Sequence, residues 1–88
     1  MYRASSGLRS TQNQDGTLVL DIEHGRIFRL NTTGSAIFDG LKVGQTSVQI
    51  IERISQTFGI AREIAQRDVS DFLKSMEEAG LVRNDADR

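Results

Sequence analysis

The sequence predicts an α+β fold in which a three-stranded antiparallel sheet comes first and three helices follow. Two observations lead to this class. Up to about residue 30, apolar side chains alternate with polar ones, which is the period of a half-buried strand. Beyond residue 31, apolar side chains recur every three or four positions, which is the period of a helix packed on a core. With 88 residues and no internal repeat, the chain is expected to form one domain.

The first two strands are separated by a turn. A short strand is expected over residues 8–11, where apolar side chains are few. Asp15-Gly16 is a dipeptide typical of a turn. The second strand is expected over residues 17–22, and its alternate apolar side chains share one face: Leu18, Leu20 and Ile22.

The third strand is expected over residues 26–30. It follows a tight turn in which Gly25 supplies a positive φ. Its side chains divide between two faces, with Phe28 and Leu30 on one and Ile27 and Arg29 on the other.

The first helix begins where the third strand stops. Residues 31–33, Asn-Thr-Thr, carry side-chain oxygens that can accept hydrogen bonds from the free amides of a new helix. The helix is expected over residues 32–41, with neighbouring apolar positions at Ala36, Ile37 and Leu41.

The second helix has a clear start and a clear end. Thr46 and Gln49 have the spacing of a capping box, in which each side chain bonds to the backbone amide of the other residue. Gly59 ends the helix. Its apolar positions fall at near-helical spacing: Val48, Ile51, Ile54 and Phe58.

The third helix is expected over residues 62–79, with Gly80 in the left-handed conformation after its end. Residues 81–82 could then add a short β bridge. The apolar stripe of this helix consists of Ala65, Val69, Phe72, Leu73 and Met76.

These elements define the expected domain limits. Residues 1–6 are expected to be a flexible N-terminus, residues 7–83 the single domain, and residues 84–88 a charged tail.

The composition favours a cytoplasmic protein that binds neither membranes nor nucleic acid. The net charge is −1, with acidic and basic residues interspersed, whereas a nucleic-acid-binding protein normally has a basic face. There is no cysteine, so disulfides and cysteine-ligated metal centres are excluded. No apolar run approaches the ~18 residues that span a bilayer, and no signal-peptide segment lies near Met1.

The sequence offers little to a catalytic mechanism. His24 is the single histidine, and it lies in a turn where the spacing positions no second ligand or base. The segment around Gly34 lacks the spacing and the lysine of a phosphate-binding loop. The protein is therefore not expected to be an enzyme or to hold a metal or another cofactor.

DNA binding is an alternative, because strands combined with three short helices can build a winged helix-turn-helix. The third helix would then enter the major groove, against the phosphate field. That helix is net acidic, since three basic residues (Arg62, Arg67, Lys74) stand against five acidic ones (Glu63, Asp68, Asp71, Glu77, Glu78).

Peptide binding is the other alternative. An outer strand leaves backbone donors and acceptors unpaired, and a guest peptide can complete the ladder as an added strand. If residues 26–30 form that strand, the third helix is placed to form the second wall of a groove, near Val69, Phe72 and Met76. Alternatively, Phe72 and Met76 are core residues. The same edge could also pair two copies of the chain into a homodimer.

The chain resembles the PqqD-like family, the RiPP recognition elements, over almost its whole length. Three segments carry the resemblance: DGTLVLDIEHGRIFRLNTTGSAIFDGL, VGQTSVQIIERISQTFGI and DVSDFLKSMEEAGLV. The resemblance implies a fold like the winged helix-turn-helix and a peptide-binding function. It implies that the leader segment of a ribosomally made precursor peptide is captured as a strand and presented to modifying enzymes.

The resemblance also implies the residues of the site. The leader would pair with the third strand, at Arg26, Ile27, Phe28, Arg29 and Leu30. The helical wall would be drawn from Asp68, Val69, Asp71, Phe72, Ser75 and Met76.

Two details indicate the branch of the family. Proteins of pyrroloquinoline quinone synthesis typically carry tryptophans, and this chain has none. The Leu-Asn-x-Thr-Gly junction and the Gly80-Leu81 ending are more similar to the standalone leader-binding proteins of lasso-peptide clusters, which work with a leader peptidase and a cyclase. A role in pyrroloquinoline quinone synthesis, or with another radical-SAM-modified peptide, is the alternative. Ala61 departs from relatives that often place a polar capping residue before the third helix.

Overall fold

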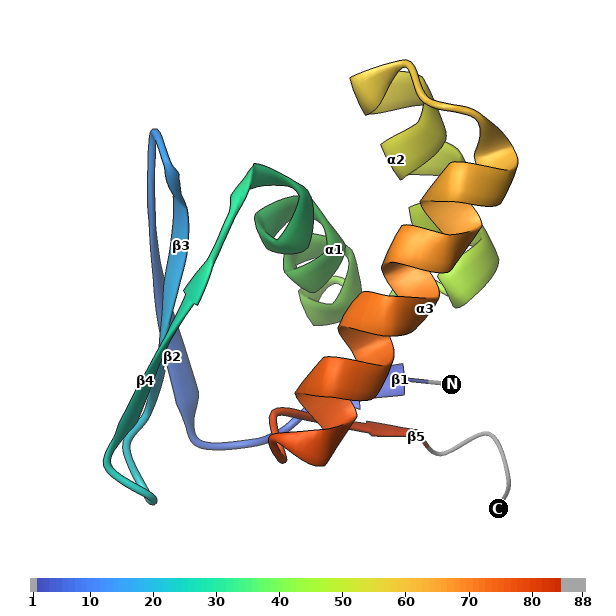
Figure 1. Cartoon of the computed structure of the whole chain (residues 1–88). Helices are drawn as coiled ribbons and strands as arrows, with labels where there is room; N and C mark the ends of the chain where they lie inside the picture. Colours follow the sequence, from blue (N-terminus) through green and yellow to red (C-terminus); the bar gives the residue numbers. More distant parts are fainter. Residues whose placement is uncertain (1, 85–88) are drawn as a thin grey trace.

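The computed structural model describes residues 2–84, which form five strands and three helices (Figure 1). The predicted α+β class, with a three-stranded antiparallel sheet before three helices, is confirmed. In chain order the elements are β1 (Tyr2–Ala4), β2 (Leu8–Asn13), β3 (Gly16–Asp21), β4 (Arg26–Leu30), α1 (Thr32–Lys42), α2 (Ser47–Phe58), α3 (Arg62–Glu78) and β5 (Val82–Asn84).

The strands β2, β3 and β4 form the antiparallel sheet, with β3 in the centre. In the register between β3 and β4, Thr17 lies opposite Leu30 and Leu20 lies opposite Ile27. The bounds of β4 agree with the sequence prediction, whereas β2 continues to Asn13, two residues further than expected.

The chain ends form a second, two-stranded sheet that the sequence did not predict in full. Residues 1–6 were expected to be flexible, but Tyr2–Ala4 form β1 and pair with β5. The amide of Ser5 extends this pairing, because it donates to the carbonyl of Leu81 at 2.8 Å. Tyr2 and Ala4 pack against the core, which a mostly polar segment does not reveal. Residues 85–88 of the expected tail lie outside the described residues.

The helices cover one face of the sheet. The helix α1 packs on β3 and β4, and α2 packs on α3. Figure 1 shows α1, α2 and α3 together on the same side of the sheet. We call the opposite side of the β2–β3–β4 sheet its outer face.

The apolar face of β3 is this outer face, and its core face is largely polar. Val19 is buried on the core face together with Thr17 and Asp21. Thr17 hydrogen bonds through its hydroxyl to the hydroxyl of Ser35 on α1, so its polar group is satisfied. The side chains of Leu18 and Leu20 are only half-buried, on the outer face.

Side-chain caps begin the first two helices, as predicted. Asn31 caps α1 by accepting a hydrogen bond from the amide of Gly34 at 2.8 Å. The capping box of α2 is present, with Thr46 and Gln49 each bonded to the backbone amide of the other. One predicted core position is wrong, because Val48 is exposed and Ile50 of the same helix is buried instead.

The third helix begins without a side-chain cap. Ala61 precedes it and offers no side-chain acceptor, but an ion pair between Arg62 and Glu52 joins its start to α2. At the other end Gly80 has φ +80°, and the amide of Leu81 returns to the carbonyl of Met76 at 2.9 Å. The main core side chains are Val19, Leu30, Ile37, Phe38, Ile50, Ile54, Val69, Leu73, Leu81 and Val82.

Candidate functional site

The strand β4 lies at an edge of the sheet, as the peptide-binding hypothesis requires. It pairs with β3 on one side, and no other described strand pairs with it on the other side. An edge strand of this kind carries backbone amides and carbonyls that a further strand can bond. The edge runs from Arg26 to Leu30, which is the strand that the sequence analysis selected.

The side chains of β4 alternate between the core and the outer face. Phe28 is half-buried and Leu30 is buried, so these two fix the strand to the domain. Ile27, which is 68% exposed, and Arg29 are on the outer face. A strand added to this edge would therefore have Phe28 beside its inward side chains and Ile27 and Arg29 beside its outward ones.

One row of α3 faces the same side of the domain as β4. Phe72 faces the start of α1, because a Cβ built on Gly34 would lie 2.8 Å from its Cε1. The carbonyl of Ala79, the C-terminal cap of α3, accepts a hydrogen bond from Arg26 of β4. Asp68 and Ser75 lie on this row by helical periodicity. We call Asp68, Phe72, Ser75 and Ala79 the α3 row.

The structure separates the predicted wall residues into two groups. Asp68, Asp71 and Ser75 are exposed and Phe72 is half-buried, so these side chains are open to solvent. Val69 and Met76 were also expected to line the wall, but they are 1% and 5% exposed and belong to the core. They pack with Leu73 in the core, which was the alternative that the sequence left open for Met76.

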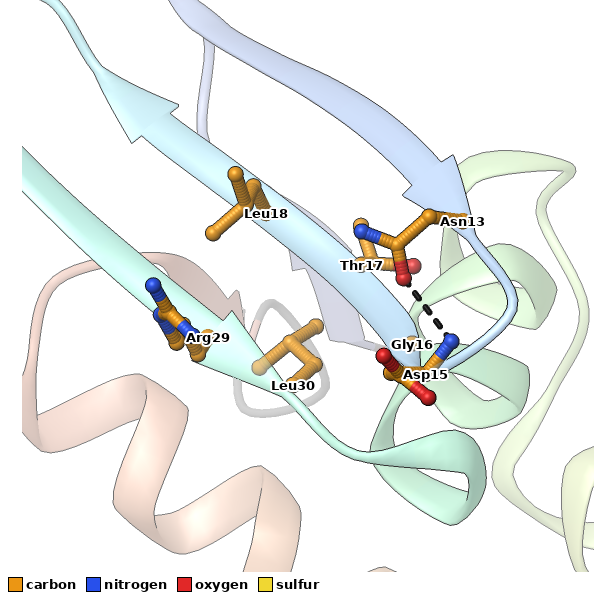
Figure 2. A pocket seen from close by; sticks show the side chains of 7 residues that line it. All are labelled: Asn13, Asp15, Gly16, Thr17, Leu18, Arg29 and Leu30. Carbon is orange, nitrogen blue, oxygen red and sulfur yellow. Dashed lines mark hydrogen bonds between the residues drawn. The ribbon is translucent and has the colours of Figure 1, made fainter.

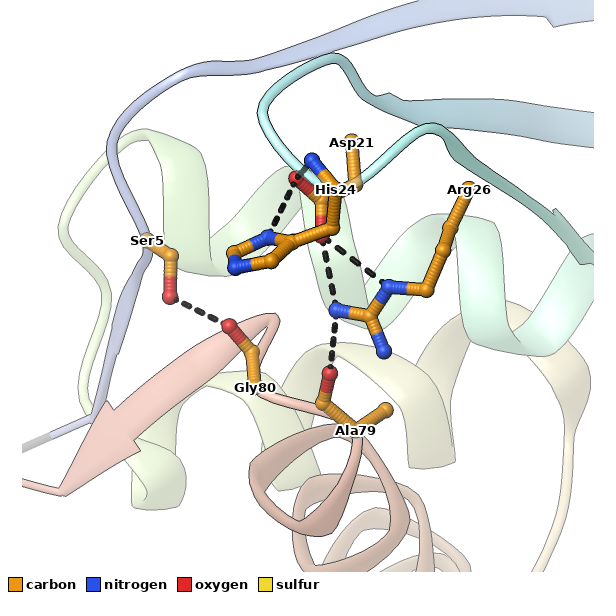
Figure 3. Close-up of polar contacts among 6 residues, drawn as sticks. All are labelled: Ser5, Asp21, His24, Arg26, Ala79 and Gly80. Atoms are coloured by element: carbon orange, nitrogen blue, oxygen red, sulfur yellow. Dashed lines mark hydrogen bonds and ion pairs between the residues drawn. The ribbon is translucent and has the colours of Figure 1, made fainter.

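Arg26 joins the start of β4 to the C-terminal end of α3 (Figure 3). Its guanidinium bonds the carboxylate of Asp21 at 2.7 Å and the carbonyl of Ala79 at 2.7 Å. It also lies over the ring of Phe28, 5.0 Å from the centroid. We call the contacts among Asp21, Arg26 and Ala79 the Arg26 bridge. Because this guanidinium is already occupied, the side chain of Arg26 holds β4 against the end of α3 and is not free to bind a guest.

The carboxylate of Asp21 is held in its charged form. The hydrogen bonds from Arg26 lower the pKa of Asp21 below its ordinary value of 3.8, and contacts with His24 add to this effect. Burial of the side chain acts in the opposite direction. The net shift is downward, so the Arg26 bridge is an ion pair at neutral pH.

The other edge of the sheet is less suited to a guest. The inner side of β2 is bonded to α1, since Lys42 donates to Ser10 at 3.0 Å and Gln12 donates to Asp39 at 2.5 Å. The strand β2 has only Leu8 as an apolar side chain, whereas β4 offers three apolar side chains in five residues. The β4 edge is therefore the better candidate for strand addition.

A small pocket lies at the C-terminal end of β4 (Figure 2). The β2–β3 turn lines it together with the start of β3 and with Arg29 and Leu30. Its volume of 170 Å³ is below the roughly 300–1,000 Å³ of a small-molecule site. Such a pocket suits a single side chain of a larger ligand.

The described residues give no grouping suited to metal binding. Among residues 2–84, no three histidine, cysteine or acidic side chains are grouped so as to hold a metal ion. The side chain of His24 is 65% exposed and contacts Asp21 at 2.9 Å (Figure 3). Within the same residues, no helix combines the length and the apolar character needed to cross a bilayer.

The fold and the site together define a small α+β domain with an open strand edge beside a helical wall. The family model described as coenzyme PQQ synthesis protein D (PqqD) matches residues 16–82. The chain belongs to the PqqD family. No curated protein matches it significantly.

Three solved structures resemble the chain. TbiB1, in a complex with the TbiA(beta) leader peptide, is 26% identical, with a TM-score of 0.87 over 96% of this chain and 98% of TbiB1. A lasso peptide synthetase B1, complexed with the leader peptide, is 23% identical, with a TM-score of 0.84 over 94% of this chain and 98% of that one.

The third structure is the PqqD truncation of Methylobacterium extorquens PqqCD, described as a functional, stand-alone RiPP recognition element. It is 22% identical, with a TM-score of 0.74 over 94% of this chain and 88% of that one. The likenesses at 23% and 22% identity confirm the fold.

Sequence reasoning missed two contributors to the site. Ala79 contributes a carbonyl to the Arg26 bridge, and a backbone group leaves no mark in the sequence. Gly34 allows Phe72 to approach the start of α1, and the only signal for this was a glycine inside a helix, where alanine would be more stable.

Proposed function

We propose that this protein is a non-enzymatic adaptor that binds the leader segment of a ribosomally made precursor peptide. The leader adds to β4 as a further strand and lies between that edge and the α3 row. The observation that carries the proposal is the match to TbiB1, which extends over nearly all of both chains and was solved with a leader peptide. The open edge of β4 supplies the physical means.

The energetics of such a complex are adequate. Several backbone hydrogen bonds contribute about 1 kcal/mol each. Two or three apolar side chains of the guest contribute about 2 kcal/mol each when they are buried. After ordering costs, these contributions can reach the roughly 8 kcal/mol of a micromolar complex. Phe28, Leu30 and the Arg26 bridge hold β4 in place, so the ordering cost falls mainly on the guest.

We assign the adaptor to lasso-peptide biosynthesis, where a leader peptidase and a cyclase would receive the bound precursor. The likeness to a lasso peptide synthetase B1 over almost the whole of both chains supports this branch. A role in pyrroloquinoline quinone synthesis, or with another radical-SAM-modified peptide, is the second candidate, and the family description favours it. The absence of tryptophan argues for the first branch.

The remaining expectations follow from this function. The adaptor would act in the cytoplasm, where ribosomal precursors are made, with residues 7–83 as the binding domain and no cofactor. Neither nucleic acid nor a membrane is a partner in this proposal. A second copy of the chain could occupy the β4 edge in the absence of the leader, and such a homodimer would dissociate when the leader binds.

The direct test looks for a short precursor-peptide gene near the gene of this protein and uses the peptide that it encodes. A synthetic leader from that precursor, titrated into the full chain and followed by fluorescence anisotropy, should bind with a Kd in the micromolar range or below. A neighbouring peptidase and cyclase would support the lasso branch. Failure of every neighbouring leader to bind the folded protein would contradict the proposal.

A further inference from the structure

The outer face of the sheet carries a distinct chemistry at the edge where the guest would add. The register places side chains in two rows across this face, Arg9–Leu20–Ile27 and Thr11–Leu18–Arg29. The centre of the face is therefore apolar, and an arginine lies at each of two opposite corners. No strand residue in these rows is acidic.

Arg29 is the arginine at the β4 edge, and it is available to a ligand. Its side chain is exposed, and none of the described ion pairs or hydrogen bonds involves it. Asp15 lies in the β2–β3 turn and lines the same small pocket, but the two are not joined by an ion pair within 4.0 Å (Figure 2). Glu23 lies in the turn that precedes β4, whereas Asp21 and Asp39 lie on the core side of the sheet, bonded to Arg26 and Gln12.

Strand addition would place an outward guest side chain directly beside Arg29. Side chains opposite one another on neighbouring strands lie about 4.5–5.5 Å apart at Cβ, and opposite charges at such positions attract while like charges repel. A second outward guest side chain, two residues away, would lie beside Ile27. That neighbour is apolar and exposed, so an apolar guest side chain would cover it.

We propose that Arg29 is a specificity-determining residue that selects a carboxylate side chain in the bound peptide. The carboxylate occupies the outward position beside Arg29, two residues from an apolar side chain that packs beside Ile27. The inference rests on the proposed function, because it requires a guest strand on β4. It adds the charge of the ligand, which neither the fold nor the similar proteins specify.

The experiment is a selection from a random-peptide display library on the immobilised full chain. Peptides enriched by the wild type should carry Asp or Glu two residues from an apolar side chain. The variant Arg29→Glu should enrich Lys or Arg at that position. The variant Arg9→Glu is the matched control, because Arg9 is exposed on the same face but at the other edge, and it should enrich the wild-type pattern.

The size of the charge preference is measured with one selected peptide and with its analogue that has Lys in place of the acidic residue. The acidic peptide should bind the wild type about two- to fivefold more tightly at low salt, in line with one exposed cross-strand ion pair. The order of preference should reverse with Arg29→Glu, and added salt should reduce both differences.

The outcomes of the selection distinguish a failure of the Arg29 proposal from a failure of the proposed adaptor function. Peptides that bind β4 without an acidic preference, or whose preference survives Arg29→Glu, would overturn the inference and leave the adaptor function intact. If the wild type enriches no peptide, or if bound peptides protect the amides of β2 and not those of β4, the proposed function fails and this inference with it.

Discussion

Arg26 donates a hydrogen bond from Nη2 to the carbonyl of Ala79 at 2.7 Å, and so joins the start of the edge strand β4 to the end of α3. The same guanidinium bonds the buried carboxylate of Asp21. The separation of strand and helix is therefore fixed at one end by the protein itself. For the proposed peptide site, this contact fixes the strand relative to the helix before a guest binds.

The variant Arg26→Ala should be less stable and should bind the leader more weakly. It leaves the carboxylate of Asp21 without its guanidinium partner and releases β4 from Ala79. Urea unfolding followed by circular dichroism should show a lower midpoint. The control Arg29→Ala, an exposed arginine of the same strand, should unfold like the wild type. Equal midpoints for the two variants would contradict a structural role of the Arg26 bridge.

The Arg26 bridge should depend on pH. The pKa of Asp21 is lower in the folded protein than its ordinary value of 3.8, so its ionised form stabilises the fold above that pH. This contribution is lost as the pH falls through the lowered pKa. The unfolding midpoint of the wild type should therefore exceed that of Asp21→Asn at pH 7, and the gap should narrow below about pH 4. A gap that stays constant down to pH 2 would show that Asp21 is not held ionised.

The variant Gly34→Ala should disturb the groove through Phe72. The new Cβ would lie 2.8 Å from Cε1 of Phe72, so the ring must move away from the start of α1. Alanine favours the helix by about 1 kcal/mol. Overpacking costs about 1–3 kcal/mol. We expect a net destabilisation in urea and a several-fold loss of leader affinity.

A double-mutant cycle tests whether Gly34 acts through this ring. Because Phe72→Leu removes Cε1, the atom nearest to the new Cβ, Gly34→Ala should cost less in that background than in the wild type. Additive effects of the two changes would refute the contact.

The variant Ile27→Pro should abolish leader binding while the domain still folds. Proline removes one backbone donor from the edge and disturbs the geometry of an added ladder. Ile27 is suited to the test because its exposed side chain contributes little packing. The control Ile27→Ala keeps the amide and should retain most of the affinity. Wild-type affinity in a folded Ile27→Pro protein would argue against pairing at this edge.

DNA binding should be absent. The helix α3 presents more acidic than basic side chains, and Arg62, one of its few cations, is paired with Glu52. A gel shift with mixed duplexes at low salt should show no complex. Tight binding that weakens steeply with salt would instead support a winged-helix regulator.

The sequence predicted the elements well where local physics decides them. The bounds of β4 were correct, and the caps at Asn31 and Thr46 placed the starts of α1 and α2. The outer position of β4 followed from a meander of short strands. The prediction that the ligand is a leader peptide came from the family resemblance and not from the periodicity of the sequence.

The sequence could not decide features that depend on tertiary packing. The pairing of β1 with β5 joins the two ends of the chain, and no local pattern indicates it. The assignment of Val69 and Met76 to the core required the rotation of α3 about its axis, which periodicity leaves open. The sequence did not show that the core face of β3 is largely polar. Thr17 and Asp21 can be buried there because they hydrogen bond to Ser35 and Arg26, which lie in other elements.

The central claim is that a leader peptide pairs with the free edge of β4, and amide NMR tests it most directly. A labelled full chain is titrated with the leader of the neighbouring precursor, and the amide shifts are followed residue by residue. The account predicts that the largest changes lie along residues 26–30 and at Phe72 and Ser75 of the α3 row. Saturable changes confined to residues 8–13, or to the outer surfaces of α2 and α3, would contradict it.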